Sequence, residues 1–280
     1  MSNTATDLIN FSITPHPTFS PEILPVRTAA CVVIGDEILN GKTLDTNSHQ
    51  LASLLFGLGI SLSKIEVIPD HEQTIINCVK RLISEKFDII FTSGGIGPTH
   101  DDITYQSLAK VFDSSGELEY DQETIKRMEA FVRQRQGRPP TEEERTSRRR
   151  MALFPKKEAE IIFVEPHLWV PVVCLAKKLY ILPGVPSLFQ QLVQALLCNY
   201  IPLPPETEKP HRIMISTPLT ESTIAPFLSA LSKRVANENI KLGSYPNLVS
   251  RLVNVSIIGT DLDRLKRLAQ EIEEEFKRLS

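Results

Sequence analysis

Apolar runs and helical periods alternate over the first 112 residues of the chain. Stretches typical of buried strands cover residues 29–34, 60–68 and 87–92. After each of them, apolar residues recur at helical spacing, following Asn47 and Asp70 and then over residues 103–112. This order predicts right-handed crossovers, and hence a three-layer α/β domain whose mostly parallel sheet has helices on both faces.

The pattern changes beyond residue 120. Residues 121–150 form a strongly charged segment of helical period, which is interrupted at residues 137–140 and restarted by Thr141 as an N-cap. Residues 170–175 and 178–182 then predict two strands that meet in a tight turn, and a further helix follows residue 186.

Four prolines within residues 201–210 predict a domain boundary. Beyond this boundary, the pattern predicts strands at 212–216 and 252–258, and helices that begin at Glu221 and Asp261. The first 26 residues are polar and punctuated by proline. The sequence therefore predicts a flexible tail over 1–26, an α/β domain over 27–204 and a small α+β domain over 205–280.

Composition and charge exclude several classes of protein. The net charge of −3 provides no overall positive field for nucleic acid or an anionic membrane. No apolar run approaches the roughly 20 residues of a membrane helix, and the tail lacks the basic start and apolar core of a secretory signal. The four cysteines match no zinc or redox spacing, which favours reduced thiols. We expect a cytoplasmic protein, the nucleus being also open, that binds neither nucleic acid nor membrane.

The strand predicted at 87–92 runs directly into a glycine-rich turn, Ser93-Gly94-Gly95-Ile96-Gly97. Glycines let the backbone approach a ligand and point amides at an anion, although many such turns need glycine for steric reasons alone. The adjacent acids Asp101 and Asp102 follow, and they suit Mg²⁺ or a similar divalent cation that neutralises phosphates. We expect one of the two to cap the next helix and the other to face the site.

Acids also follow the other two predicted strands. Asp36 and Glu37 come after the first strand, and Asp70 comes after the second. The carboxyl ends of parallel strands share one edge of a sheet, where such folds bind their ligands. The three loops therefore predict a carboxylate cluster around a phosphate-binding turn, which suits metal-assisted cleavage or transfer at a diphosphate.

Two further candidates have simpler interpretations beside the functional ones. His100 is either a general acid or base, or a polar contact of its loop. The cluster Arg148-Arg149-Arg150 is either a phosphate clamp or a solvated helix end that opposes the macrodipole. The simpler role is the commoner one in both cases.

In their order along the chain, these motifs resemble a known family, the molybdopterin-binding (MoaB/Mog) domain. The similarity is strongest to the branch found in the protein CinA and at the N-terminus of eukaryotic FAD synthases. It rests on the segments Gly-Asp-Glu-Ile-Leu-Asn-Gly at 35–41, Asp-Thr-Asn-Ser at 45–48, Pro-Asp at 69–70, Ser-Gly-Gly-Ile-Gly-Pro-Thr-His-Asp-Asp-Ile-Thr at 93–104 and Leu-Pro-Gly-Val-Pro-Ser at 182–187. It covers roughly residues 27–200, and the C-terminal module takes the place of the small α/β domain that follows in CinA-like proteins.

The resemblance implies a three-layer α/β fold, a pterin or adenine nucleotide as the bound small molecule, and a homo-oligomer. In the CinA and FAD synthase branch it also implies a pyrophosphatase that depends on Mg²⁺, Mn²⁺ or Co²⁺ and acts on ADP-ribose or FAD. The catalytic residues it predicts are Glu37, Asp70, Asp101 and Asp102. The predicted metal ligands are Asp36, Asp101 and Asp102. The predicted ligand-binding residues are Gly35, Asn40, Asp45, Ser93, Gly94, Gly95, Gly97 and Thr99.

One loop departs from the family pattern. Many relatives have Asn-x-x-Gly-x-Ala-Pro-Gly before the last strand pair, where residues 164–171 read Val-Glu-Pro-His-Leu-Trp-Val-Pro. A loop on the substrate side is thus replaced, and the resemblance alone does not identify the substrate. The similarity includes neither the deamidase domain of CinA nor the adenylyltransferase domain of FAD synthase, so it predicts neither nicotinamide-mononucleotide deamidation nor FAD synthesis.

Three functions are open at this point. The leading hypothesis is a metal-dependent hydrolase of a nucleotide diphosphate, FAD or ADP-ribose. The second is a molybdopterin adenylyltransferase that uses the same glycine-rich turn. The third is a protein that binds a pterin or nucleotide without turning it over.

Overall fold

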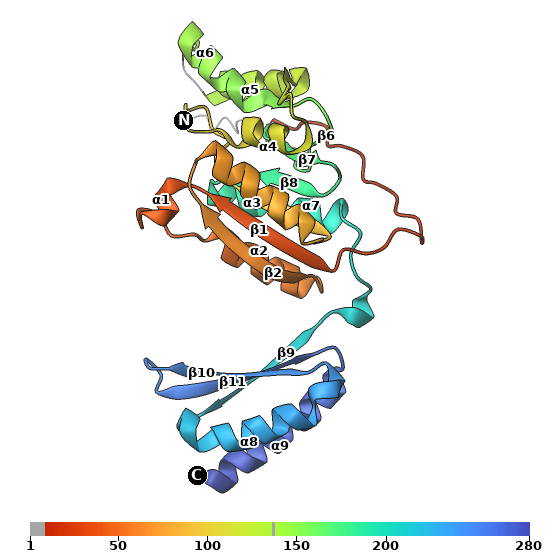
Figure 1. The fold of residues 1–280 in the computed structure, drawn as a ribbon, viewed down its shortest axis with the longest axis vertical. Helices are drawn as coiled ribbons and strands as arrows, with labels where there is room; N and C mark the ends of the chain where they lie inside the picture. Colours follow the sequence, from red (N-terminus) through yellow and green to blue (C-terminus); the bar gives the residue numbers. More distant parts are fainter. Residues whose placement is uncertain (1–8, 136–137) are drawn as a thin grey trace, which may run out of the picture. The chain divides into compact units, whose positions relative to one another are not determined.

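The computed structural model of the chain describes residues 9–135 and 138–280 (Figure 1). Gly137, within the predicted helix interruption, lies outside the described residues, as do the first eight residues of the predicted tail. The chain divides into two compact units, Met1–Leu203 and Pro204–Ser280. This division falls one residue from the boundary that the prolines indicate, and each unit is described separately below.

The first unit is built on a six-stranded sheet. Its strands lie in the order β2 (Ser61–Ile68), β1 (Thr28–Ile34), β3 (Ile89–Ser93), β8 (Leu179–Leu182), β7 (Val172–Leu175) and β6 (Ala159–Ile162). The first four strands are parallel, whereas β7 and β6 are antiparallel to their neighbours. The predicted mostly parallel sheet is confirmed. The strands predicted at 170–175 and 178–182 are β7 and β8, and the tight turn between them is confirmed as well.

The helices cover both faces of this sheet, which makes the unit three-layered (Figure 1). The helices are α2 (Asn47–Gly57) and α7 (Pro186–Asn199) on one face, and α3 (Glu72–Ser84) and α4 (Thr104–Phe112) on the other. Successive residues of β1 point to opposite faces, so Cys31 and Val33 pack with α2 and α7 while Val32 and Ile34 pack with α3 and α4. Burial on both faces explains why the strand is continuously apolar.

The charged segment folds into two helices beside this core, α5 (Gln122–Arg135) and α6 (Glu142–Arg149). Thr141 caps α6 as predicted, because its hydroxyl accepts a hydrogen bond from the Glu144 amide while the Glu144 carboxylate accepts one from the Thr141 amide. No residue of α6 is buried. The remaining elements of the unit are α1 (Asp36–Leu39), the paired strands β4 (Leu118–Tyr120) and β5 (Leu153–Pro155), and the short helix η1 (Arg150–Ala152).

The described part of the predicted tail is attached to the first unit. The Phe11 amide donates to the Pro166 carbonyl at 2.8 Å, and the Thr14 amide donates to the Phe163 carbonyl at 2.9 Å. The Arg127 guanidinium lies 3.6 Å from the centroid of the Phe163 ring and 5.2 Å from that of the Phe11 ring. The prediction of a flexible tail is therefore corrected for residues 11–14, because aromatic stacking and backbone pairing are not visible in a polar, proline-rich composition.

The second unit is a three-stranded antiparallel sheet with two long helices. The strands lie in the order β10 (Lys241–Asn247), β11 (Leu252–Gly259) and β9 (His211–Thr217), and the helices are α8 (Glu221–Arg234) and α9 (Leu262–Leu279). Two short helices, η2 (Glu206–Glu208) and η3 (Ala236–Glu238), complete it. Ile215, Val255 and Leu268 belong to its core, which confirms the predicted α+β module. None of the helices within the described residues is both long and apolar enough to cross a membrane.

Candidate functional site

Four loops of the first unit begin at the same edge of the sheet, because β2, β1, β3 and β8 are parallel. The Gly35 amide donates to the Ile68 carbonyl at 3.1 Å, which joins the loops after β1 and β2. The Gly94 amide donates to the Leu182 carbonyl at 3.2 Å, which joins the loops after β3 and β8. The structure thus brings the glycine-rich turn and the predicted acids to one edge.

Asp70 is the acid that follows β2 at this edge. Its Oδ2 accepts a hydrogen bond from the Asp36 amide at 3.0 Å, and its side chain is half-buried. Burial raises the pKa of Asp70, and the charges of Glu37, Asp36 and Asp101 raise it further, against the Asp36 amide, which lowers it. The charges of three of the predicted acids thus act on Asp70 at this edge.

Asp102 has a different role from the one predicted. Its Oδ1 accepts from the Gly97 amide at 2.6 Å, and its Oδ2 accepts from the Thr99 amide at 2.9 Å and from the Thr99 hydroxyl. The cap position of α4 is occupied by Ile103, which makes no side-chain capping bond. Asp102 therefore stabilises the loop before it instead of capping the helix after it, and both its oxygens are engaged within the chain.

Asp101 is the acid of the pair that faces solvent. The Thr99 hydroxyl and the amide of Asp101 itself hold the pKa of Asp101 below its usual range, and the charges of His100 and Arg150 contribute in the same direction. Arg150 is thus the member of the predicted arginine cluster whose charge reaches this edge. The expectation that one of the two acids caps α4 is therefore wrong, because Asp102 bonds the loop before the helix, whereas Asp101 is exposed at this edge.

The glycine-rich turn has a conformation that side chains rarely adopt. Gly94 has φ +107° and Gly95 has φ +65°. A Cβ on Gly94 would overlap the Ile34 carbonyl oxygen. A Cβ on Gly95 would overlap the Thr104 hydroxyl and lie 3.2 Å from Asp70 Oδ1. The turn therefore lies close to Asp70. The packing of the chain itself requires glycine at both positions, whether or not a ligand is bound.

The amides of this turn are only partly available to an anion. The Gly94, Gly97 and Thr99 amides donate within the chain. Among the described residues, no acceptor pairs with the amides of Gly95 and Ile96. From the sequence, the amides of three glycines are candidate donors to a phosphate. In the folded turn, the candidates are the two consecutive amides of Gly95 and Ile96.

Asn47 and Thr104 are structural residues of the site that the sequence analysis did not assign. Buried Asn47 donates from Nδ2 to Ser93 Oγ and to the Gly184 carbonyl, both at 2.9 Å. The Thr104 hydroxyl donates to the Gly94 carbonyl, and the Thr104 amide donates to the Gly95 carbonyl, each at 3.0 Å. Both lie inside the motifs that carry the family resemblance, and this position is the signal by which they could be found. Ser93, predicted to bind ligand, is buried and held by Asn47.

Three other predicted ligand-binding residues support loops. Asp45 accepts from the Ser48 amide at 3.0 Å and from the Ser48 hydroxyl at the start of α2. Exposed Asn40 accepts from the Lys42 amide at 3.0 Å. Gly35 is buried and donates to the sheet edge, as described above. Whether any of them also contacts a ligand stays a prediction.

The acids offer hard oxygen donors of the kind that divalent cations prefer. The raised pKa of Asp70 has the charges of Glu37, Asp36 and Asp101 among its causes, and a cation would relieve this repulsion. Within residues 9–135 and 138–280, however, no group of three or more His, Cys, Asp or Glu side chains is placed to hold a metal. The donor chemistry fits a divalent cation, whereas a closed set of protein ligands is not preformed.

The first unit is therefore an α/β domain of the class that binds small molecules at the carboxyl edge of a parallel sheet. Residues 30–203 match the family described as the probable molybdopterin binding domain, and this match covers more than half of the chain. The chain belongs to this molybdopterin-binding domain family. Residues 209–280 match a second family, described as the middle domain of FAD synthase.

Individual relatives agree with this assignment. A probable FAD synthase of Caenorhabditis briggsae is 32% identical over 243 residues, which cover 82% of this chain and 46% of that protein. A probable FAD synthase of Caenorhabditis elegans is 30% identical over 251 residues, 85% of this chain and 47% of that protein. The chain thus spans about half the length of these two relatives. The crystal structure of the protein CinA from Thermoplasma acidophilum, whose function is unknown, is similar with a TM-score of 0.51 and 27% identity, covering 62% of this chain and 97% of that one.

Proposed function

We propose that this chain is a hydrolase of nucleotide diphosphates that cleaves FAD or ADP-ribose with the help of a divalent cation. The observation that carries the proposal is the position of the Asp70 carboxylate, whose Oδ1 would lie 3.2 Å from a Cβ on Gly95, at an edge where burial and three neighbouring acids raise the pKa of Asp70. A carboxylate with a raised pKa is a better proton acceptor for water than an ordinary one. The similarity to FAD synthases and to their middle domain favours a flavin nucleotide as substrate.

Each residue of this edge has its own role in the proposed reaction. The Gly95 and Ile96 amides donate to an oxygen of the diphosphate and stabilise the charge that develops there. Asp70 accepts a proton from the water that attacks one phosphorus atom. The bond from this phosphorus to the bridging oxygen breaks and the other phosphate leaves with that oxygen, which gives AMP and FMN from FAD. Asp36 and Asp101 are the residues that would hold the cation, which supplies polarisation of the diphosphate. Asp102 and Asn47 keep the loops in place.

The test is a panel of substrates and metals. FAD, ADP-ribose, NAD and molybdopterin with ATP are incubated with Mg²⁺, Mn²⁺ or Co²⁺, and products are separated by chromatography. Release of AMP with FMN, or of AMP with ribose 5-phosphate, is the expected result. An adenylylated pterin would replace the proposal by adenylyl transfer, which the family match favours as the second candidate. Tight binding without any product would contradict hydrolysis and leave a binding protein.

Substitution of Gly95 tests the turn separately, in buffer with a chelator. The positive φ and the overlap with Thr104 make Gly95→Ala strained by about 1–3 kcal/mol, so the turn must move. We expect FAD to bind about tenfold more weakly or worse, because 1.4 kcal/mol is a factor of ten, whereas riboflavin, which lacks phosphate, changes much less.

Gly57→Ala is the matched control, since no atom lies within 4 Å of a Cβ at Gly57. It should leave the affinity for both compounds unchanged. If Gly95→Ala weakens FAD and riboflavin equally, the glycine serves only the turn, and the phosphate must be held elsewhere.

A further inference from the structure

A cleft with a volume of about 570 Å³ is lined by residues of α5, of α6 and of the segment that precedes α6. It shares no lining residue with the glycine-rich turn or with the carboxylate cluster. Five arginines line it: Arg133, Arg138, Arg145, Arg148 and Arg149. The cleft is therefore a distinct feature of the molecule that the proposed hydrolase does not use.

The positive charge of this cleft is not balanced by its own acids. Its lining contains two carboxylates, Glu129 and Glu142, against five guanidinium groups, of which that of Arg138 is also paired with Glu144. These acids lie 3.9 Å from Arg149 and 3.6 Å from Arg145, which are loose separations for ion pairs. A guanidinium stays charged at every physiological pH, so this excess cannot be removed by loss of protons. An anion in the cleft would neutralise it.

Arg133 differs from the other arginines of the cleft in its contacts within the chain. It is exposed, and no ion pair or hydrogen bond to another described residue involves its side chain. Arg138, by contrast, is committed to Glu144, with hydrogen bonds of 2.7 and 3.0 Å. Because the whole chain carries a net charge of −3, the cationic lining is a local arrangement and not a general property of the surface.

Apolar groups line the same cleft. Buried Met128 and partly buried Val132 contribute from α5, and Pro139 and Pro140 contribute from the segment before α6. The helix α6 buries none of its own residues, so packing of α6 does not fill this space. The cleft thus combines apolar contact surface with guanidinium groups, which is the composition needed for a ligand that has both a ring and an anionic group.

We propose that this cleft binds a phosphate-bearing small molecule of nucleotide size. Its phosphates lie among Arg133, Arg145 and Arg149, and its ring lies against Met128 and Pro139. Arginine binds phosphate through paired N–H donors, which lysine cannot present in the same way. The volume falls within the range of roughly 300–1,000 Å³ of small-molecule pockets.

The experiment is a calorimetric titration of ADP, and separately of pyrophosphate, into the full chain in buffer with a chelator. The Gly95→Ala chain serves as background, so that binding at the glycine-rich turn is suppressed. We expect saturable binding of both compounds in this background, and an affinity at least tenfold lower when Arg133→Glu or Arg145→Glu is added. ADP should bind more tightly than pyrophosphate, because only ADP carries a ring.

Arg267→Glu in α9 is the matched control, because it reverses the same charge on an exposed arginine of the second unit. It should leave both affinities unchanged. Equal affinity in the Arg133→Glu, Arg145→Glu and control chains would overturn the proposal, and so would the absence of saturable binding at millimolar concentrations. Circular dichroism establishes that each variant is folded before it is titrated.

Discussion

At the scale of single residues, Asp70 is the group whose ionisation the fold opposes. Its pKa is raised above that of an unfolded aspartate by burial and by three neighbouring acids. A raised pKa means that the folded state binds the proton more tightly than the unfolded state does. The stability linked to Asp70 is therefore fully present below the ordinary pKa of aspartate, and it is lost as the pH rises through the raised value.

We accordingly expect Asp70→Asn to increase the free energy of unfolding at pH 7 in the absence of metal. The asparagine oxygen still accepts from the Asp36 amide, but it carries no charge. The same substitution should reduce turnover by roughly 10²–10⁴, the usual contribution of a general base. Urea denaturation at pH 7 and at pH 3, with a chelator present, measures the stability. The gain should vanish at the lower pH, and a variant less stable than the parent chain at pH 7 would contradict this account.

Asp101 and Asp102 are adjacent acids that should respond differently to the same substitution. Asp102→Asn removes a charged acceptor from the Gly97 and Thr99 amides and should lower the free energy of unfolding by about 1–3 kcal/mol. Asp101→Asn changes an exposed side chain and should leave the free energy of unfolding nearly unchanged, while metal-dependent turnover falls. Chemical denaturation compares the two variants. Equal losses of stability would show that Asp102 is not a support of the loop.

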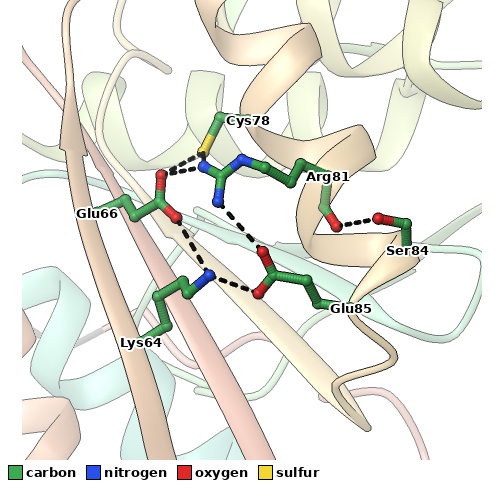
Figure 2. A network of polar contacts seen from close by, with 6 residues as sticks. All are labelled: Lys64, Glu66, Cys78, Arg81, Ser84 and Glu85. Atoms are coloured by element: carbon green, nitrogen blue, oxygen red, sulfur yellow. Dashed lines mark hydrogen bonds and ion pairs between the residues drawn. The ribbon is translucent and has the colours of Figure 1, made fainter.

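At the scale of elements, the edge strand β2 is attached to α3 by a network of charges (Figure 2). Arg81 of α3 donates to Glu66 of β2 and, at 3.2 Å, to Glu85, which lies 2.5 Å from Lys64. Cys78 Sγ lies 3.5 Å from Glu66 Oε2. Charged side chains on an edge strand also discourage pairing with a strand of another molecule.

The hydrogen bond from Arg81 is the main cause that lowers the pKa of Glu66. A lowered pKa contributes stability that is present above the ordinary pKa of glutamate and is lost as the pH falls through the lowered value. Glu66→Gln should therefore lower the free energy of unfolding at pH 7 by up to about 1 kcal/mol, and the difference should disappear in acid. Denaturation over a pH series measures this. Glu22→Gln, at an exposed site, should show no such dependence, and a Glu66→Gln effect that persists in strong acid would rule out the ion pair as its cause.

Most of the elements could be predicted from periodicity, and the exceptions have identifiable physical reasons. The strand β10 escapes detection because Gly243 and Pro246 interrupt its alternation. The docked segment at residues 11–14 depends on stacking with Arg127, which is distant in sequence. At the site, the acids follow strands that run in the same direction. This is sufficient to predict that they lie at one edge of the sheet.

The orientation of each loop side chain could not be predicted in the same way. Asp101 and Asp102 are identical in type and adjacent in sequence, and only the folded loop determines that Asp102 turns inward. The sequence also cannot distinguish the Gly94 amide from the Gly95 amide. In the folded chain, the Gly94 amide donates to the Leu182 carbonyl. Sequence therefore predicts which groups reach the edge, whereas the path of the loop decides which of them are left for a ligand.

At the scale of the whole molecule, each unit has its own core. The site residues all lie in the first unit, and half of the acids of the second lie on α9. A chain that ends at Leu203 should consequently fold and bind FAD with unchanged affinity, while residues 204–280 should give a separate cooperative melt. Circular dichroism and a binding titration test this. Loss of binding in a shortened chain that remains folded would contradict it. The expected homo-oligomer and cytoplasmic location stay predictions.

The hydrogen bond from Asn47 to Gly184 joins residues that are 137 positions apart. During synthesis, Asn47 emerges from the ribosome long before its acceptor exists, and β3 likewise waits for β8 as its second neighbour. Closure of such long loops costs entropy before the contacts that reward it can form, so folding is slow for a chain of this size. Competence to bind a ligand at this edge is therefore acquired late, once the chain beyond Gly184 has emerged.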